Sequence, residues 1–280
     1  MNAWTLALLS ALLAACAAAP VPPRHEPRFA NDALFAPPSE RVDAGQVFAL
    51  SDEMRRYVAD QIAARARVKG RPVALIDVLY AQSELRLTYD SSSTRAAAEA
   101  FASRSGNCLS LVIMTAAFAK ELGLGVRYQK VFVDDAVGRD GDIYMAIGHV
   151  NLTLATHRTD ESIGFRVGKR PPESGAMTVD FLLQDDLRGM RAQGIAEATV
   201  VAMYMNNRAV EALARGKVDD AHWRAREAVA QDPDYLPGYN TLGVVFQRHG
   251  NAREAEPVLR HVLEREPGER AGDFPSRQRC

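Results

Sequence analysis

The sequence contains little cysteine, with three residues in a chain of 280. An odd number cannot form a complete set of disulfide pairs, so a disulfide-rich scaffold is excluded. The chain also lacks an excess of charge of either sign, because 34 basic and 35 acidic residues leave a formal net charge of −1. Such a chain has no general electrostatic attraction for nucleic acid, and we expect no nucleic-acid partner. Its length and its 25% charged content indicate a folded protein of one large or two small domains.

The motifs that usually bind metals and nucleotides are missing as well. The chain has no CxxC or HExxH spacing and no GxxxxGK[ST] or GxGxxG loop. The acidic stretch at 134–142 lacks the residue order of a calcium-binding loop, and we interpret it as a solvated turn. We therefore expect neither a metal site nor a bound cofactor.

The apolar run at the N-terminus is too short to cross a membrane, which takes about 20 apolar residues. It is typical of a secretory signal over residues 1–15, and residues 13–16 (Leu-Ala-Ala-Cys) resemble the bacterial lipobox. In a lipobox the signal is cut before a cysteine that becomes lipidated. We expect Cys16 to carry this lipid and to anchor the protein in the bacterial cell envelope, on the outer membrane and facing the periplasm. The alternative is an ordinary secretory signal with a chance cysteine.

The two segments that flank the body of the chain have the composition of flexible regions. Residues 17–38 contain six prolines, so we expect residues 16–40 to be an extended tether rather than a packed element. At the other end, residues 268–280 are polar and are expected to be a disordered tail. We assign no role to Cys280 in this tail.

Residues 41–190 combine helical patterns with strand patterns in two successive halves. Apolar residues at helical spacing predict helices first, and β-branched and aromatic runs predict strands afterwards. Helices followed by antiparallel strands indicate an α+β domain. The polar segment 155–176 is an insertion for which the sequence predicts no structure. The predicted helices lie at 52–67, 72–80, 94–104 and 109–122, and the predicted strands lie at 126–133, 144–154 and 177–183.

Residues 198–267 are predicted to be entirely helical and carry an internal repeat. Three residues recur after 34 positions: Gly216, Ala221 and Pro233 return as Gly250, Ala255 and Pro267. This period and these residue types resemble tetratricopeptide repeats. The resemblance implies helix pairs with the glycines in the turns, the alanines where two helices cross closely, and the prolines after the second helix. It also implies a protein partner for this module.

Cys108 stands where the Gly106-Asn107 break meets the start of the predicted helix 109–122. The first backbone amides of a helix have no intrahelical partner and carry partial positive charge. They stabilise a thiolate at this position, which makes the sulfur a better nucleophile, and they can donate to an oxyanion. The alternative hypothesis is that Cys108 is a small buried hydrophobe without chemistry.

His149 and Asp180 are the residues that could complete such a site. Alternation along the predicted strand places His149 and Asn151 on its polar face. Asp180 points away from the apolar face of the next predicted strand. A carboxylate beside a histidine fixes the tautomer and stabilises the imidazolium. Cys108, His149 and Asp180 are therefore a candidate thiol triad.

The order of these residues resembles the transglutaminase-like fold of the papain-like cysteine enzymes. That family has a Gly-x-Cys motif, a long helix, a strand with His and a strand with Asp, which is similar to Gly106-x-Cys108, His149 and Asp180 within residues 52–186. The resemblance implies that Cys108 is the nucleophile, His149 the general base and then acid, and Asp180 the orienting group. It implies a peptidase or amidase that acts on a protein or peptide through a thioester, or a crosslinking enzyme if an amine accepts the acyl group.

Two features depart from the family pattern. The aromatic residue that often follows the histidine, as His-x-Trp, is replaced by Asn151, and the segment 155–176 lengthens the step to Asp180. Asp160 in that segment is a rival for the third position, although its surroundings indicate a loop, and we interpret His157 there as a solvated residue. A second hypothesis is thus an inactive scaffold that binds envelope proteins or peptides, and a third is a chance match in an unrelated α+β domain.

Overall fold

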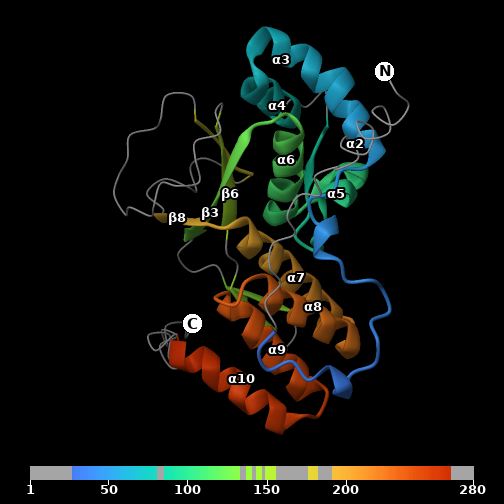
Figure 1. Cartoon of the computed structure of the whole chain (residues 1–280), viewed down its shortest axis with the longest axis vertical. Coiled ribbons are helices and arrows are strands. Elements are labelled where there is room, and N and C mark those ends of the chain that lie inside the picture. Colours follow the sequence, from blue (N-terminus) through green and yellow to red (C-terminus); the bar gives the residue numbers. More distant parts are fainter. Residues whose placement is uncertain are drawn as a thin grey trace, which may run out of the picture.

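The computed structural model describes residues 27–80, 85–132, 137–140, 143–146, 149–155, 176–181 and 191–265. The predicted mixture of helices and sheet, followed by a C-terminal helical region, is confirmed (Figure 1). Cys16 and Cys280, with the predicted signal and the predicted tail, lie outside the described residues. Within the part of the chain that the structure describes, no helix is both long and apolar enough to cross a membrane.

The predicted helices of the N-terminal part are present with small shifts of their ends. The first begins after Ser51, whose hydroxyl accepts a hydrogen bond from the Met54 backbone N–H at 3.2 Å, and it ends at Gly70, which has a φ of 85°. A π-helical turn interrupts it, so it consists of three consecutive pieces. The elements are α2 (Asp52–Tyr57), η3 (Val58–Ile62), α3 (Ala63–Lys69), α4 (Arg71–Tyr80), α5 (Ala97–Ser103) and α6 (Cys108–Glu121), preceded by the 3-10 turns η1 (Asp32–Leu34) and η2 (Ala44–Gln46).

The main sheet has four antiparallel strands in the order β7, β6, β3, β8. Leu152 in the second of these strands lies opposite Tyr128 on one side and Val179 on the other. A short parallel pair, β1 and β2, lies before α6. The strands are β1 (Thr88–Tyr89), β2 (Ser105–Gly106), β3 (Gly125–Phe132), β4 (Val137–Asp140), β5 (Ile143–Ala146), β6 (His149–Ala155), β7 (Met177–Val179) and β8 (Arg191–Ile195).

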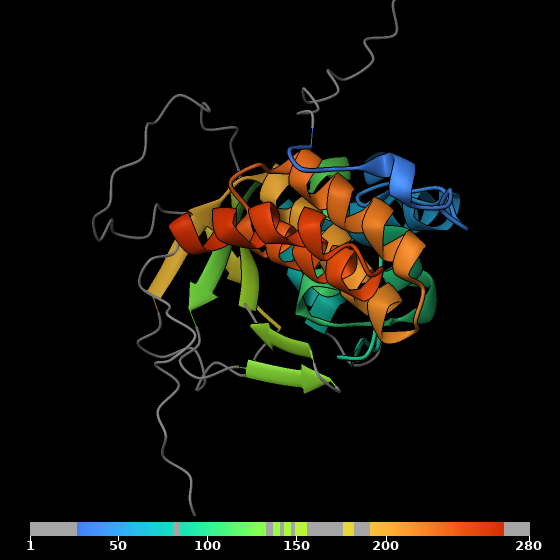
Figure 2. The ribbon, with the colours of Figure 1, turned by 90° about the horizontal axis from the view of Figure 1, so that it is seen from below.

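Two of the strand predictions need correction. The strand predicted at 144–154 is two strands, because β5 pairs with β4 in a separate hairpin while β6 joins the main sheet (Figure 2). The solvated turn predicted around residue 138 is also wrong, since Gly138, Arg139 and Asp140 form backbone pairs with β5. Strand β7 is shorter than its predicted range of 177–183, and most of the segment 155–176 lies outside the described residues.

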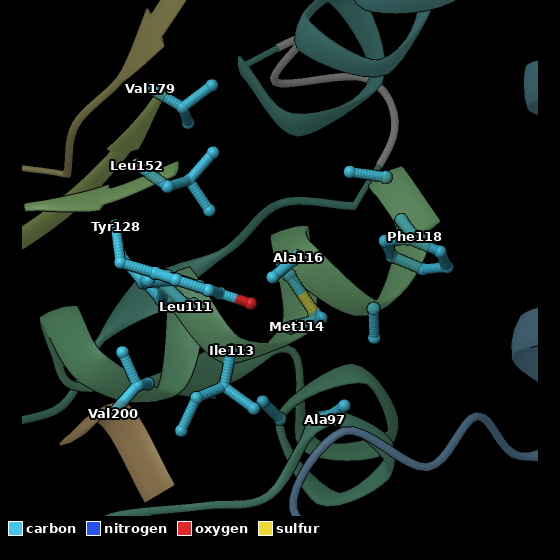
Figure 3. Packing of buried hydrophobic residues seen from close by; sticks show 14 of the residues in the cluster. Ala97, Leu111, Ile113, Met114, Ala116, Phe118, Tyr128, Leu152, Val179 and Val200 are labelled. Atoms are coloured by element: carbon cyan, nitrogen blue, oxygen red, sulfur yellow. The ribbon is translucent and has the colours of Figure 1, made fainter. Parts of the chain in front are cut away.

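Helix α6 is the centre of the hydrophobic core. All its residues from Leu109 to Ala119 are buried, because it packs against β3 and β6 of the sheet and against α4, α5 and α7 (Glu197–Ala214). A helix that is apolar on every face is stable only when it is buried in this way. In Figure 3 the side chains of Leu152 and Val179 from the sheet lie on one side of α6, and Val200 of α7 lies on the other.

The C-terminal region consists of two helical hairpins. The first contains α7 and α8 (Val218–Gln231), and the second contains α9 (Leu236–Arg248) and α10 (Ala252–Arg265). Gly216 and Gly250 occupy the turns with φ angles of 72° and 90°, a region that L side chains rarely adopt. Ala221 and Ala255 are fully buried, so small side chains stand at equivalent places in both hairpins.

The predicted tether differs from the structure over its described part. Residues 27–40, which we call the N-terminal strap, pack against the C-terminal helices, and Phe35 is buried among them (Figure 1). The proline content suggested an extended chain without contacts, but Phe29 and Phe35 supply apolar surface that the helices bury. The part of the tether at residues 16–26 lies outside the described residues.

Two glycines of α9 provide a test of close packing in the second hairpin. A Cβ atom on Gly243 would lie 2.5 Å from Leu259 Cδ2 and 2.7 Å from its Cγ, whereas a Cβ on Gly238 would meet its neighbours at an ordinary 3.5 Å. Alanine in a helix gains about 1 kcal/mol over glycine, and overpacking costs about 1–3 kcal/mol. We expect Gly243→Ala to have a lower free energy of unfolding than Gly238→Ala by about 1–3 kcal/mol in urea titrations. Equal stabilities would show that α10 moves aside freely.

Candidate active site

Cys108 is the first residue of α6, as predicted, and it is partly exposed. The preceding Asn107 caps the helix, because its Oδ1 accepts hydrogen bonds from the Ser110 backbone N–H at 2.9 Å and from the Ser110 hydroxyl at 2.8 Å. This cap satisfies an amide of the first turn without using the amide of Cys108 itself. The thiol therefore stands at the positive end of a long, buried helix.

Gly106 permits the close approach that this start of α6 requires. A Cβ atom on Gly106 would lie 2.6 Å from Ser110 Cβ, a separation that real structures do not show. Gly106 also pairs with Tyr89 in the parallel β1–β2 pair, which brings the Tyr89 side chain close to Cys108. Burial and the negative charge of the Cys108 thiolate both raise the pKa of Tyr89. The glycine of the Gly-x-Cys motif thus has a steric role.

A polar network connects the cap of α6 to the C-terminal helices. Asn107 donates from Nδ2 to the Thr94 hydroxyl at 2.8 Å, and the backbone N–H of Thr94 donates to Glu211 Oε1 at 2.7 Å. Asn207 of α7 donates to the same hydroxyl at 3.3 Å. Thr94 is buried and bonded to its distant partners before α5 begins at Ala97, which explains why the helix does not start at residue 94 as predicted.

His149 and Asp180 lie side by side at the edge of the main sheet. His149 is the first residue of β6, and Asp180 follows the last residue of β7. The distance between His149 Nε2 and Asp180 Oδ1 is 2.7 Å, and both side chains are at least nine-tenths buried. The sequence argument had paired these two residues across neighbouring strands, and the structure brings them together.

Two further residues hold Asp180, Asn151 through the carboxylate and Tyr80 through the backbone, and neither was assigned a role from the sequence. Asn151 donates from Nδ2 to Asp180 Oδ2 at 2.7 Å, so each carboxylate oxygen has a partner on β6. The Tyr80 hydroxyl accepts from the Asp180 backbone N–H at 3.1 Å and donates to the Asp180 carbonyl oxygen. Strand alternation places Asn151 on the face of His149 and could have identified it. Tyr80 comes from α4, and no local pattern indicates its contact.

Cys108 also contributes to the charge state of the His149 ring. Burial of the ring works against its charged form, but hydrogen bonds to Asp180 and Cys108 and the negative charges of both raise the pKa of His149 to about 9. Because Asp180 holds Nε2, the nitrogen left for the thiol is Nδ1. The His149 ring therefore carries a proton at neutral pH, beside the Asp180 carboxylate.

The other sequence candidates are outside this cluster. His157, Asp160, Cys16 and Cys280 belong to residues that the structure does not describe. Asp180 occupies the position beside the histidine for which Asp160 was considered as a rival. Among the described residues, no group of three or more His, Cys, Asp or Glu side chains is arranged to hold a metal ion.

Comparison of the chain with protein-family models, with curated proteins and with solved structures finds no match. The chemistry of the site therefore has to be argued from its own residues.

The pKa of His149 predicts how the site responds to loss of the carboxylate. Its pKa is about 9, above the usual 6.5, so the ring stabilises the folded state fully below about pH 6.5 and loses this effect as the pH rises through about 9. In Asp180→Asn we expect the pKa of His149 to fall by about 1–3 pH units, measured by NMR titration of the ring. The exposed carboxylate variant Asp77→Asn is the matched control and should leave this pKa unchanged. An unaltered titration in Asp180→Asn would contradict the assigned pairing.

Proposed function

We propose that this protein is a cysteine hydrolase of the transglutaminase-like type that cleaves amide bonds in a protein or peptide. The observation that carries the proposal is the convergence of three elements on one imidazole. His149 Nε2 lies 2.7 Å from Asp180 Oδ1, and Cys108 raises the pKa of the same ring through hydrogen bonding and charge. A nucleophile, a base and an orienting group within mutual reach are the recurring arrangement of covalent acyl-transfer enzymes.

The proposed reaction follows from these positions. The Cys108 sulfur attacks the amide carbonyl carbon and forms a C–S bond, and the oxyanion is held by backbone amides at the start of α6. His149 then gives its proton to the leaving nitrogen, so that the C–N bond breaks and a thioester and a free amine result. Water, deprotonated by His149, attacks the thioester, and the thiolate leaves as the carboxylic acid forms. If an amine attacks instead of water, the product is a crosslink.

The arrangement of the elements supports the proposed family. A long helix that begins at the nucleophile packs against the antiparallel strands that follow it, and the strand with the histidine lies next to the one that ends at the aspartate. This order is the one that the Gly-x-Cys, His and Asp pattern implies. Asn151 occupies the place expected for an aromatic residue and supports the carboxylate instead.

We further propose that the two C-terminal hairpins are tetratricopeptide-type repeats that bind a protein partner. Helices α8 and α10 each have 14 residues, and they begin 34 positions apart, at Val218 and Ala252. Glycine in each turn and a buried alanine in each second helix support this proposal.

The decisive measurement for the enzyme proposal is the reactivity of Cys108. In the chain with Cys16→Ser and Cys280→Ser, only Cys108 can be alkylated. We expect iodoacetamide at pH 7 to modify it at least about tenfold faster than a free-cysteine peptide, because the helix start and the imidazolium stabilise the thiolate. The rate is measured by intact mass over time.

Two variants separate a catalytic pair from a merely exposed thiol. His149→Ala should lower the alkylation rate to about that of the model thiol. His261→Ala, which changes a histidine of α10, should leave the rate unchanged. A Cys108 that reacts no faster than the model peptide in the unaltered background would count against the hydrolase and favour the scaffold hypothesis.

We also propose that the protein is an envelope lipoprotein anchored through Cys16, which the Leu-Ala-Ala-Cys sequence at 13–16 supports. The full chain expressed in a bacterium should fractionate with the outer membrane and incorporate labelled palmitate. Cys16→Ser should abolish both, because the thiol is the site of lipid attachment, whereas Cys280→Ser should change neither. Palmitate incorporation by Cys16→Ser would refute the assigned site.

A further inference from the structure

The N-terminal strap is bound to the C-terminal helices in the way that a receptor binds a peptide. Side chains of α8 bond to the main chain of the strap: Asp219 accepts from the Ala36 N–H at 2.9 Å, and Trp223 Nε1 donates to the Ala36 carbonyl oxygen at 2.8 Å. Asp220 accepts from both the backbone N–H and the hydroxyl of Ser39, at 2.7 and 2.6 Å. These contacts fix an extended segment irrespective of most of its side chains.

Two phenylalanines, six residues apart, anchor the strap in aromatic surroundings. Phe35 stacks on His222 with a centroid distance of 3.8 Å and an interplanar angle of 7°, and it is 7% exposed. Phe29 lies against Tyr239 and His261, with centroids 6.2 and 5.4 Å away. Large aromatic anchors of this kind supply most of the binding energy in peptide and protein interfaces.

Charge on the strap matches charge on α8. Asp32, midway between the two phenylalanines, accepts from Arg226 Nε with both carboxylate oxygens, at 3.0 and 2.9 Å, and contacts His222 Nε2 at 3.0 Å. Glu40 contacts Arg224 Nη2 at 2.9 Å. Two carboxylates of the strap are therefore bound by two arginines of a single helix.

The end of the strap at Phe29 is held less well than the end at Phe35. Phe29 has a φ of 68°, a conformation that is unfavourable for a bulky side chain. Beside it lies a hollow of about 240 Å³, lined by Phe29, Arg28, Glu256 and His261, and the buried Nε2 of His261 has no hydrogen-bond partner among the residues that the structure describes. Another peptide could fill this end better than the strap does.

We infer that the face formed by α8, α9 and α10 is a peptide-binding surface that the chain occupies with its own residues 27–40. Its external ligand is a segment of a partner protein with two phenylalanines six residues apart and an aspartate midway between them. The strap is a tethered competitor for that ligand. This inference rests on the proposed partner binding by the C-terminal hairpins and names the chemistry of that partner, whereas alkylation of Cys108 tests the thiol chemistry separately.

The test is the binding of a fluorescent peptide with the sequence of residues 27–40, followed by anisotropy. A tethered segment has an effective concentration in about the millimolar range, so micromolar peptide cannot displace it from the unaltered chain. In the full chain with Phe29→Ala and Phe35→Ala the strap is loosened, and the peptide should bind at least about tenfold more tightly than to the unaltered chain. Peptides with Phe35→Ala or Asp32→Asn should bind about tenfold more weakly.

A second version of this binding experiment leaves every residue of the strap unchanged. A protease site is introduced at residues 41–43, which follow the strap, and the full chain is cut after folding. The labelled peptide should then exchange into the cut chain, and Arg226→Gln in the same background should weaken its binding about tenfold. Failure of both the loosened and the cut chain to bind better than the intact chain would overturn the inference. So would an intact chain that light scattering shows to be a dimer exchanging straps, because the strap would then bind a second copy.

Discussion

Burial of α6 along its whole length is the constraint on which the rest of the structure depends. The helix contacts sheet on one side and α4, α5 and α7 on the others, and fully buried side chains such as Phe118 and Ile113 each contribute about 1.5–3 kcal/mol. A helix held on every side cannot rotate or slide without opening a cavity. Its first residue, Cys108, is therefore fixed in space. Because β6 packs directly on α6, the same core also sets where His149 stands relative to the thiol.

Among the three buried histidines of the described residues, His149 differs from the other two in the direction of its pKa shift. Burial lowers the pKa of His222 and of His261, which keeps these rings neutral in the core of the helical region. At His149 the Asp180 carboxylate and the Cys108 thiolate reverse the effect of burial. A buried charged pair is costly to desolvate and is weak support for stability. Perturbed ionisable pairs of this kind cluster at functional sites, and this one supports the proposed chemistry more than it supports stability.

Local patterns predicted the parts of the site that depend on neighbouring residues in the chain. The Gly106-Asn107 break places Cys108 at a helix start, and strand alternation places His149 on a polar face. Contacts between segments that are far apart in the sequence produce no local sequence pattern of this kind. Glu211 bonds to Thr94 across 117 positions, and Tyr80 reaches Asp180 across 100, so neither could be found from periodicity.

The N-terminal strap escaped prediction for a related reason. Proline content indicated an extended chain, whereas the strap contains the 3-10 turn η1, and composition does not tell whether such a segment is solvated or bound. The α8 residues that bind Ala36 of the strap, Asp219 and Trp223, are more than 180 positions away from it in the sequence. The two phenylalanines in this otherwise tether-like segment were the sequence feature that indicated binding, because a solvated tether does not bury aromatic rings.

The C-terminal helices are a structural part of the candidate site. Through α7 they supply Glu211 and Asn207 to Thr94, and Thr94 in turn holds the Asn107 cap at the start of α6. A hydrogen bond to a charged acceptor contributes about 1.5–3 kcal/mol, so this contact is a substantial part of what orders the loop before the thiol. The neighbouring helix α8 binds the strap with its own polar side chains. Two hairpins that merely displayed a surface would have no need for buried polar bonds to the cap of another helix. Their presence shows that the helical region helps to hold the start of α6, where Cys108 stands.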